Sequence, residues 1–512
     1  MTLYDPHDVS HPRDTNIKQR KVSRTMNRLV NTIEKSSNRT ARTHNGAVSN
    51  HSTLNACVDM FGNIGSMRAR TTEDIIIIFT KAFAEDPLKA MKILFWARDI
   101  RGGAGERKVF RTIAHYLAVN HSAKLRKNLV LFVEFGRWDD LFELVGTPLE
   151  KDVVKIVRSQ YVSDLKSERP SLLAKWLPSN NTSSAKTRKL AKFFEQKLNL
   201  SSKGYRKNLS ALRERIKVLE RELCHGDWTK IDFEKVPSRA AMQYRKAFFK
   251  NAEAQYQKFL GQVEKGEKTI KASTLYPYDI VRGIRQGGDR SLNAQWNALP
   301  NYVDPFNGIV VCDTSGSMTG SGYYGGKNDQ VAPIDVALSL TLYIAERNTG
   351  DWQNKFITFS SSPALQSIQG TTIAEKVRNL SRAHWNMSTN IQAVFDLVLS
   401  TAKKINASED EMPRTIFIVS DMQFNQACSG HTNLEAIRDK YAKAGYEMPQ
   451  LVFWNVNAYG KEAPITVDDT GTCLVSGCSP AILKSVLSGE VITPVDVMNA
   501  TIESPRYSTV QV

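Results

Sequence analysis

The sequence predicts an α-helical region followed by an α/β domain built on a doubly wound parallel sheet. Before residue 300, apolar residues recur at helical spacing and no stretch alternates like a strand. After Pro300, short β-branched apolar runs alternate with helical stretches. The charge also changes sign there, from 54 Lys and Arg against 31 Asp and Glu (+23) to 15 against 21 (−6). A chain of 512 residues is long enough for two large domains.

Composition favours a globular protein, because 41% hydrophobic and 24% charged residues are ordinary for one and too apolar for disorder. No apolar run resembles a secretory signal or reaches the ~18 residues of a membrane span. We therefore expect a cytoplasmic protein without membrane contact. Six scattered cysteines indicate reduced structural thiols. The alternative is a zinc site built from Cys224, His225, Cys473 and Cys478, although paired ligand spacings are missing.

Residues 1–50 are polar and lack apolar periodicity, which predicts a mobile basic arm with order beginning near Leu54. Helices are predicted at 75–83, 87–96, 106–119 and 124–135, the second opened by Asp86 as N-cap and Pro87 in the first turn. Short loops between them predict antiparallel neighbours. We interpret residues 51–300 as an α-helical repeat region, an α-solenoid of HEAT-like helix pairs.

A single helix is predicted at 203–223, where leucines and one isoleucine recur every three or four residues. Its other faces are almost wholly charged. The cations could follow a phosphate backbone, or they could pair with the interleaved glutamates as surface salt bridges. Residues 151–250 carry 24 basic and 10 acidic side chains, and a local surplus of this size attracts polyanions such as nucleic acid.

In the region 301–512, strands are predicted at 308–313, 355–360, 414–421 and 450–456, and helices at 333–347, 389–404, 432–444 and 479–488. Ligands of such sheets bind outside the carboxyl ends of the strands. Two strands end there in oxygen-bearing residues. The first continues into Asp313-Thr314-Ser315-Gly316-Ser317, and another ends in Asp421. Thr389, at the start of a predicted helix, adds a third hydroxyl.

Hard oxygen ligands of this kind suit Mg²⁺ or Mn²⁺, which tolerate bound water. With two carboxylates and three neutral hydroxyls, a vacant coordination position would stay electrophilic and could accept a carboxylate from a partner protein. The predicted metal ligands are Asp313, Ser315, Ser317, Thr389 and Asp421. The alternative is that Asp313 and Thr389 cap helix N-termini.

This pattern resembles the metal-ion-dependent adhesion site of von Willebrand factor A domains, over roughly residues 306–490. The resemblance implies that Ser315, Ser317 and Thr389 are hydroxyl ligands and that the two aspartates contact the ion directly or through water. One departure is Asp421-Met422, where relatives have Asp-Gly, which predicts a looser loop. Domains of this type are adhesive rather than hydrolytic, so the resemblance implies no enzyme activity.

The N-terminal half also carries a family resemblance. WARDIRGGAGERKVFR, EFGRWDDLFEL, SLLAKWLPS and VPSRAAMQYRKAF, with LVSGCSPAILK near the C-terminus, are similar to a family related to Ro ribonucleoproteins that occurs in viruses, fungi and plants. In Ro-like proteins a ring-shaped helical-repeat module of the TROVE type precedes the A domain. The resemblance implies binding of structured or misfolded noncoding RNA, and a viral member would work in the host cytoplasm.

No motif aligns individual RNA ligands, so the RNA-binding candidates come from local charge alone. They are Arg98, Arg101, Arg107, Lys108, Arg137, Lys175, Arg188, Lys189, Arg206 and Lys207. Arg137 beside Trp138 could stack a base, although a tryptophan in a helical repeat is more often part of the core.

Three functions remain open from the sequence. The first is an RNA-binding ribonucleoprotein scaffold whose A domain recruits a protein through its metal. The second is a protein-interaction adaptor that binds no RNA, and the third a metal-dependent nuclease. Glycines 102, 103 and 105 do not have the order of a phosphate-binding loop and follow no strand, so we interpret them as a turn between helices.

Overall fold

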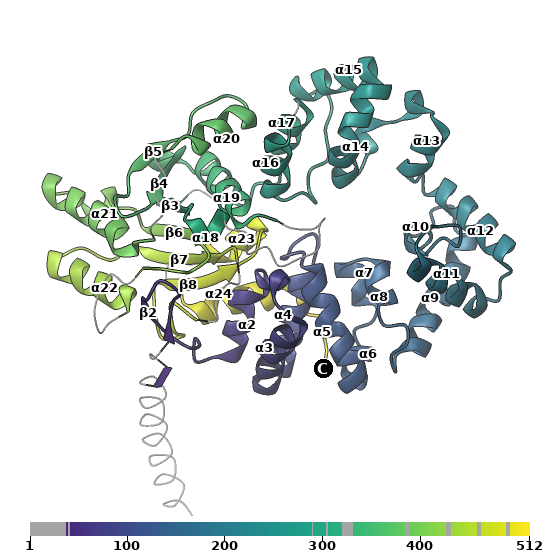
Figure 1. Ribbon diagram of the computed structural model, residues 1–512, viewed down its shortest axis with the longest axis horizontal. Coiled ribbons are helices and arrows are strands. Elements are labelled where there is room, and N and C mark those ends of the chain that lie inside the picture. The colour runs from purple at the N-terminus through teal and green to yellow at the C-terminus, as the bar shows by residue number, and fades with distance from the viewer. Residues whose placement is uncertain are drawn as a thin grey trace, which may run out of the picture.

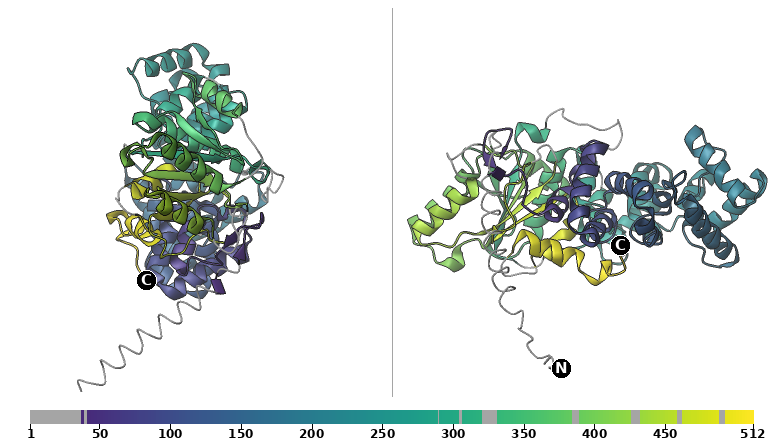
Figure 2. Two further views of the ribbon diagram at one scale, coloured as in Figure 1. Left: turned by 90° about the vertical axis from the view of Figure 1, so that its left-hand side faces the viewer. Right: turned by 90° about the horizontal axis from the view of Figure 1, so that it is seen from below.

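A computed structural model describes residues 37–38, 41–288, 290–303, 306–319, 331–383, 389–425, 432–457, 462–487 and 492–512. Figure 1 shows helices following one another around a ring that meets a sheet domain at one side. Figure 2 shows the helical region extending away from that domain. Among the described residues, no helix is both long enough and apolar enough to cross a bilayer.

The helical region follows a short hairpin of β1 (Ala41–Arg42) and β2 (Val48–Ser49). Its elements are α2 (Ala56–Ile64), η1 (Met67–Ala69), α3 (Thr72–Glu85), α4 (Pro87–Arg98), α5 (Arg107–Asn120), α6 (Ser122–Arg126), α7 (Leu131–Phe135), α8 (Trp138–Phe142), α9 (Glu150–Lys166), α10 (Leu173–Trp176), α11 (Ala185–Lys197), α12 (Ser202–Arg215), α13 (Leu219–His225), η2 (Trp228–Lys230), η3 (Phe233–Lys235), α14 (Ser238–Asn251), α15 (Glu253–Glu264), α16 (Pro277–Arg285) and α17 (Arg290–Asn297).

Local signals explain several of these helices. Asp86 caps α4 by accepting the Lys89 N–H at 2.9 Å, and Pro87 occupies the first turn, as predicted. The glycines after α4 form a turn between helices, also as predicted: a Cβ on Gly103 would lie 2.0 Å from the Trp96 carbonyl oxygen.

The ring closes where the segment before α16 meets the loop between α4 and α5. The Tyr276 hydroxyl, just before α16, donates to the Ala104 carbonyl in the loop between α4 and α5. Both ends also pack on the sheet domain, α2 against β8 and α16 against α19. Arg285 on α16 forms an ion pair with Asp335 on α19. The arc is therefore anchored at two places on one domain.

The sheet domain contains β3 (Gly308–Asp313), α18 (Gly316–Thr319), α19 (Pro333–Arg347), η4 (Gly350–Trp352), β4 (Lys355–Phe359), β5 (Leu365–Ser367), α20 (Ile373–Ser381), α21 (Ile391–Ile405), η5 (Glu409–Glu411), β6 (Thr415–Ser420), α22 (Asn433–Ala444), β7 (Gln450–Asn455), β8 (Thr472–Ser476), η6 (Pro480–Ile482), α23 (Leu483–Val486), α24 (Pro494–Ile502) and η7 (Pro505–Tyr507). The described strands lie in the order β5-β4-β3-β6-β7-β8, all parallel except the edge strand β5.

The sheet is buried on both faces, which explains the continuous apolar runs of its strands. Alternate residues of each strand enter different cores. Val310 packs with α19 in the core that continues into the helical ring, whereas Ile309 and Val311 pack with α21 and α22 on the opposite face. The predicted class, a helical region followed by an α/β domain with a mostly parallel sheet, is confirmed.

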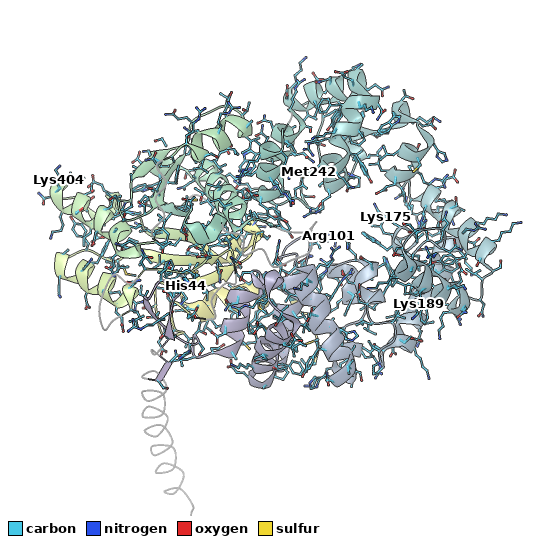
Figure 3. All side chains as sticks on the ribbon, viewed as in Figure 1. His44, Arg101, Lys175, Lys189, Met242 and Lys404 are labelled. Carbon is cyan, nitrogen blue, oxygen red and sulfur yellow. The ribbon has the colours of Figure 1, made fainter. Side chains whose placement is uncertain are left out.

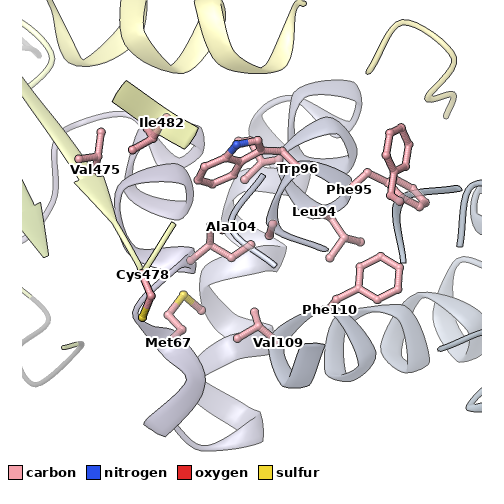
Figure 4. Close-up of a cluster of buried hydrophobic side chains, with 14 of the residues drawn as sticks. Met67, Leu94, Phe95, Trp96, Ala104, Val109, Phe110, Val475, Cys478 and Ile482 are labelled. Atoms are coloured by element: carbon pink, nitrogen blue, oxygen red, sulfur yellow. The ribbon is translucent and has the colours of Figure 1, made fainter. Parts of the chain in front are cut away.

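A continuous apolar core joins the two regions, and Figure 4 shows part of it. Trp96 and Met67 of the helical region lie in the same buried cluster as Val475 and Ile482 of the sheet domain. Close approach of the backbones requires Gly65 at the end of α2, because a Cβ there would lie 2.4 Å from the Ser476 carbonyl oxygen.

Three predicted elements are wrong in detail. The helix predicted at 124–135 is divided into α6 and α7, and the one at 203–223 into α12 and α13. The second break has a clear cause, since Leu209 and Leu212 pack in the main core while Leu219 and Leu223 pack in a separate core under α14 and α15. The helix predicted at 479–488 is reduced to η6 and α23.

The basic arm predicted for residues 1–50 is also wrong in part. Residues 41–50 are ordered, and their hairpin packs on the sheet domain through contacts with residues near 389, 424 and 463. Residues 1–36, 39 and 40 lie outside the described part of the chain. The hairpin has too few apolar residues to carry a strand pattern, which is why the sequence did not indicate it.

Candidate functional site

The candidate site lies at the carboxyl ends of β3 and β6, the two neighbouring strands in the middle of the sheet. From β3 the chain continues outward to β4 and β5, and from β6 it continues in the opposite direction to β7 and β8. The strand order therefore reverses between β3 and β6, and this switch point is the position where doubly wound sheets bind ligands.

Asp313, the last residue of β3, has no exposed side-chain surface. Its carboxylate accepts the Ser315 N–H on Oδ1 at 2.8 Å and the Ser420 hydroxyl on Oδ2. The next residues turn into α18, and this turn brings the hydroxyls of Ser315 and Ser317 to 3.1 Å from each other. Ser315 is buried, whereas Ser317 is exposed.

Asp421 follows β6 and is 1% exposed. Its Oδ1 accepts the Gln423 N–H at 3.3 Å, and the Ser317 hydroxyl lies close enough to lower the pKa of this carboxyl group. Its Oδ2 is buried without a hydrogen-bond partner in the described part of the chain. A buried carboxylate oxygen without a donor is costly, and it indicates a place for a cation or a bound water.

Met422 has a backbone φ of 66°, in the left-handed region that favours glycine. Met422 therefore adopts the backbone conformation that a glycine at this position would favour, and the looser loop expected from the Met stays a prediction. The Met422 side chain is 5% exposed and packs with Phe424 and Ile418 in the core beside α21. Burial of this side chain offsets the backbone strain.

Thr389 is 1% exposed and precedes α21. Its hydroxyl lies 2.8 Å from the Gln423 carbonyl oxygen and 3.1 Å from Asn425 Oδ1. The helix cap is Asn390, which accepts the Ala393 N–H at 3.2 Å. Capping, the alternative considered from the sequence, is therefore not the role of Thr389.

The two aspartates destabilise each other's charged form. Burial raises the pKa of Asp313 to about 6, and repulsion from Asp421 adds to the effect. Burial also raises the pKa of Asp421, while the Ser317 hydroxyl and the nearby His44 act in the opposite direction. A divalent cation between the carboxylates would remove this repulsion. The oxygen ligands and the unpartnered Asp421 Oδ2 fit Mg²⁺ or Mn²⁺.

In the described ranges, no three His, Cys, Asp or Glu side chains gather as a metal site, and this holds for the candidate site as well. A cation bound between Asp313 and Asp421 would therefore need hydroxyl ligands in addition to the two carboxylates. Asn45 of the N-terminal hairpin contacts Thr389 and Gln423 at this site, and sequence reasoning missed it. An asparagine 344 residues before Thr389 carries no local pattern that could indicate such a contact.

Arg98 does not belong among the RNA-binding candidates. It is 2% exposed, and its guanidinium lies 2.6 Å from the Asp140 carboxylate, which also accepts a hydrogen bond from Arg111. A buried, paired guanidinium has no surface for a phosphate.

Arg137 is half-buried, pairs with Asp139 at 2.9 Å and stacks 4.2 Å from the centre of the Trp176 ring.

Trp138 is 6% exposed and belongs to the core, as the more common role of such a tryptophan suggested. The remaining candidates are exposed or half-buried. Figure 3 places Arg101 and Lys175 along the inner edge of the ring. The candidates with exposed side chains are Arg101, Arg107, Lys108, Arg188, Lys189, Arg206 and Lys207.

Some exposed cations already make contacts within the chain. Lys108 donates to the Arg68 and Arg70 carbonyls at 3.0 and 2.9 Å, and Arg188 donates to two carbonyls just before α11. On α12, Arg213 and Arg215 donate to backbone carbonyls of neighbouring segments. Internal bonding therefore accounts for part of the charge on the predicted 203–223 helix.

The fold defines a two-part protein, a ring of helices joined to a mostly parallel sheet domain with a buried carboxylate pair at its switch point. Comparisons with known proteins agree on two parts. Residues 43–187 and 147–303 match the domain of unknown function DUF2828, and residues 307–507 match the domain of unknown function DUF7788.

The chain is also 31% identical over 509 residues to "Uncharacterized protein L728" of Acanthamoeba polyphaga mimivirus, covering 90% of this chain and 87% of that protein. The chain belongs to the DUF2828 family.

Proposed function

We propose that this protein binds RNA through its helical ring and a divalent cation through its sheet domain, as a ribonucleoprotein scaffold or RNA quality-control factor. In this proposal the ring is a TROVE-type module of HEAT-like repeats, and the sheet domain is of the von Willebrand factor A type. The observation that carries it is the division of charge. Residues 1–300 carry a net charge of +23, whereas the remaining residues carry −6 and hold the buried, repelling carboxylates at the sheet switch point.

Support for the RNA part comes from position and accessibility. Lys189 on α11 and Arg206 and Lys207 on α12 have exposed side chains on neighbouring helices of the ring. Arg101 and Lys175 line its inner edge (Figure 3). Exposed cations spread over several helices of a ring suit a long flexible polyanion better than a compact anion.

Support for the metal part comes from the donor set. Asp313, Ser315, Ser317, Thr389 and Asp421 would hold Mg²⁺ or Mn²⁺ with water at the remaining positions. The exposed Ser317 marks the side from which a carboxylate of a protein partner could complete the coordination. The role we assign to the ion is adhesion to that partner, without catalysis.

Titration of the full chain with MgCl₂ or MnCl₂ in a calorimeter tests the binding of the cation. Absence of binding heat at millimolar ion refutes the metal part of the proposal.

The RNA part is tested by the affinity of the full chain for a structured RNA, measured by fluorescence anisotropy between 50 and 300 mM KCl. We expect affinity to fall steeply with salt, because each phosphate contact releases counterions. The triple variant Lys189→Ala, Arg206→Ala, Lys207→Ala should lose about tenfold in RNA affinity. The slope of log affinity against log salt concentration should be shallower by about 2 to 3.

The matched control is the double variant Lys403→Ala, Lys404→Ala, which removes exposed lysines from α21 at the far side of the sheet domain (Figure 3). Its RNA affinity should stay within twofold of the unmodified protein. Salt-independent or absent RNA binding refutes the RNA part and favours a protein-interaction adaptor. Cleavage of the RNA on addition of Mg²⁺ would instead favour a nuclease.

A further inference from the structure

The N-terminal hairpin lies against the loops of the candidate metal site. The Thr43 hydroxyl donates to the Phe424 carbonyl at 2.6 Å, and the His44 N–H donates to Gln423 Oε1 at 2.7 Å. Gly46 forms a β-bridge with Asn425. These contacts join residues about 380 positions apart to the segment that directly follows Asp421.

A second set of contacts holds the far end of the hairpin. Asn50 and Ala463 exchange backbone hydrogen bonds of 3.0 and 2.8 Å, and the Ser49 hydroxyl donates to the Ala463 carbonyl at 2.9 Å. Ala47 is buried in the same core as Met422. The hairpin is therefore fixed by contacts that do not involve the Asn45 side chain.

The Asn45 amide reaches into the site itself. Its Nδ2 donates to the Gln423 carbonyl at 2.6 Å and to the Thr389 hydroxyl oxygen at 3.4 Å. The Thr389 hydroxyl in turn lies 2.8 Å from the same Gln423 carbonyl. Asn45 thus spans the segment before α21 that carries Thr389 and the segment after β6 that carries Asp421.

The hydrogen-bonding positions of the Thr389 hydroxyl show which one the Asn45 amide occupies. A threonine hydroxyl has one proton and two acceptor positions. The Thr389 proton is directed to Gln423 O or Asn425 Oδ1, because both oxygens lie within 3.1 Å and neither can donate. The Asn45 amide occupies one acceptor position, so the second remains for a cation.

We propose that Asn45 is a positioning residue of the metal site: it sets the orientation of the Thr389 hydroxyl, and the hairpin of residues 41–49 forms one wall of the site. This inference rests on the proposed metal function. Partners of a metal ligand orient that ligand, and their loss typically lowers metal affinity between 10- and 100-fold. We expect the lower end of this range here, because the contact to Thr389 is long.

Calorimetric titration of the full chain with MnCl₂ tests the inference on Asn45→Ala beside Thr43→Ala. Thr43 secures the same hairpin to Phe424 without touching Thr389, so its variant reports loosening of the hairpin alone. Asn45→Ala should weaken Mn²⁺ binding about tenfold, whereas Thr43→Ala should stay within threefold. Asn45→Gln, which keeps the amide on a longer side chain, should recover part of the affinity.

Amide hydrogen exchange of residues 43–47 supplies a second measurement. Mn²⁺ should slow exchange there in the unmodified protein and have a smaller effect in Asn45→Ala. Equal Mn²⁺ affinity of Asn45→Ala and the unmodified protein overturns the inference and leaves the metal function standing. An equal loss in both variants also overturns it, because hairpin docking would then be the cause. If the unmodified protein binds no Mn²⁺, the proposed metal function fails and this inference fails with it.

Discussion

Asp313→Asn should stabilise the metal-free protein at neutral pH while abolishing its response to Mg²⁺. The asparagine has nearly the same shape and keeps an oxygen to accept the Ser315 N–H. The Ser420 hydroxyl, which donates to the other Asp313 oxygen, can rotate and accept from the new amide instead. The substitution therefore removes a buried negative charge and one metal ligand with little loss of hydrogen bonding.

The magnitude follows from the pKa of Asp313, raised from 3.8 to about 6 by burial and by Asp421. The folded state binds this proton more tightly than the unfolded state. The stabilisation that comes from the protonated Asp313 carboxyl group is therefore fully present below pH 4, is lost as the pH rises through about 6, and is absent above that. At ~1.4 kcal/mol per pH unit, the charge costs the metal-free protein about 3 kcal/mol at pH 7.5.

The assay is urea unfolding of the EDTA-treated full chain at pH 7.5. Asp313→Asn should be more stable than the unmodified protein by up to ~3 kcal/mol at pH 7.5 and by much less at pH 4.5. Adding Mg²⁺ at a hundredfold excess over its dissociation constant should stabilise the unmodified protein by about 2.7 kcal/mol, and the variant not at all.

The control is Asp396→Asn on α21, which removes an exposed carboxylate paired with Lys440. Its stability should change by less than about 1 kcal/mol at either pH. If metal-free Asp313→Asn is no more stable than the unmodified protein at pH 7.5, the argument from buried charge is refuted. If the variant gains as much from Mg²⁺, the metal assignment is refuted.

Two further substitutions test the packing. Arg98→Ala should lower the free energy of unfolding by about 3 kcal/mol, because it leaves Arg111 as the remaining cation beside the buried Asp140 carboxylate. Arg101→Ala on the exposed surface should lower it by less than about 1 kcal/mol. Equal effects in urea unfolding would contradict the burial of Arg98. Met422→Gly relieves ~1 kcal/mol of strain from the left-handed backbone conformation. It also removes a buried side chain, and this loss costs ~2 to 4 kcal/mol of stability. Net destabilisation of roughly 2 kcal/mol is expected in the same assay, and a gain would show that strain dominates.

Much of the secondary structure is predictable because its causes are local. Asp86 and Pro87 start α4 through a cap and a fixed φ, which involve only adjacent residues. The strand at 308–313 and the helix at 333–347 have the predicted bounds, since a buried run and a long periodic stretch are read from neighbouring positions. The edge strands β5 and β8 lack such a pattern and were not predicted.

The proximity of the two aspartates could be predicted for the same reason. Asp313 ends β3 and Asp421 follows β6, and the carboxyl ends of neighbouring parallel strands share one edge of the sheet, whereas no such rule places Thr389, which lies before α21. Arg98 shows where this reasoning stops. Its sequence neighbours are those of a surface cation, and only packing of α4 against α8 buries it beside Asp140.

By itself, then, the sequence determined which segments become helices and strands, how charge divides between the two regions, and which oxygen-bearing residues end the central strands. Only the tertiary structure decided that the helices close into a ring through Tyr276 and Ala104, which cations stay exposed, and that Asn45 reaches Thr389. The physical reason is range. Periodicity and capping act over a few residues, whereas these contacts join positions 172 and 344 residues apart and depend on how every intervening element packs.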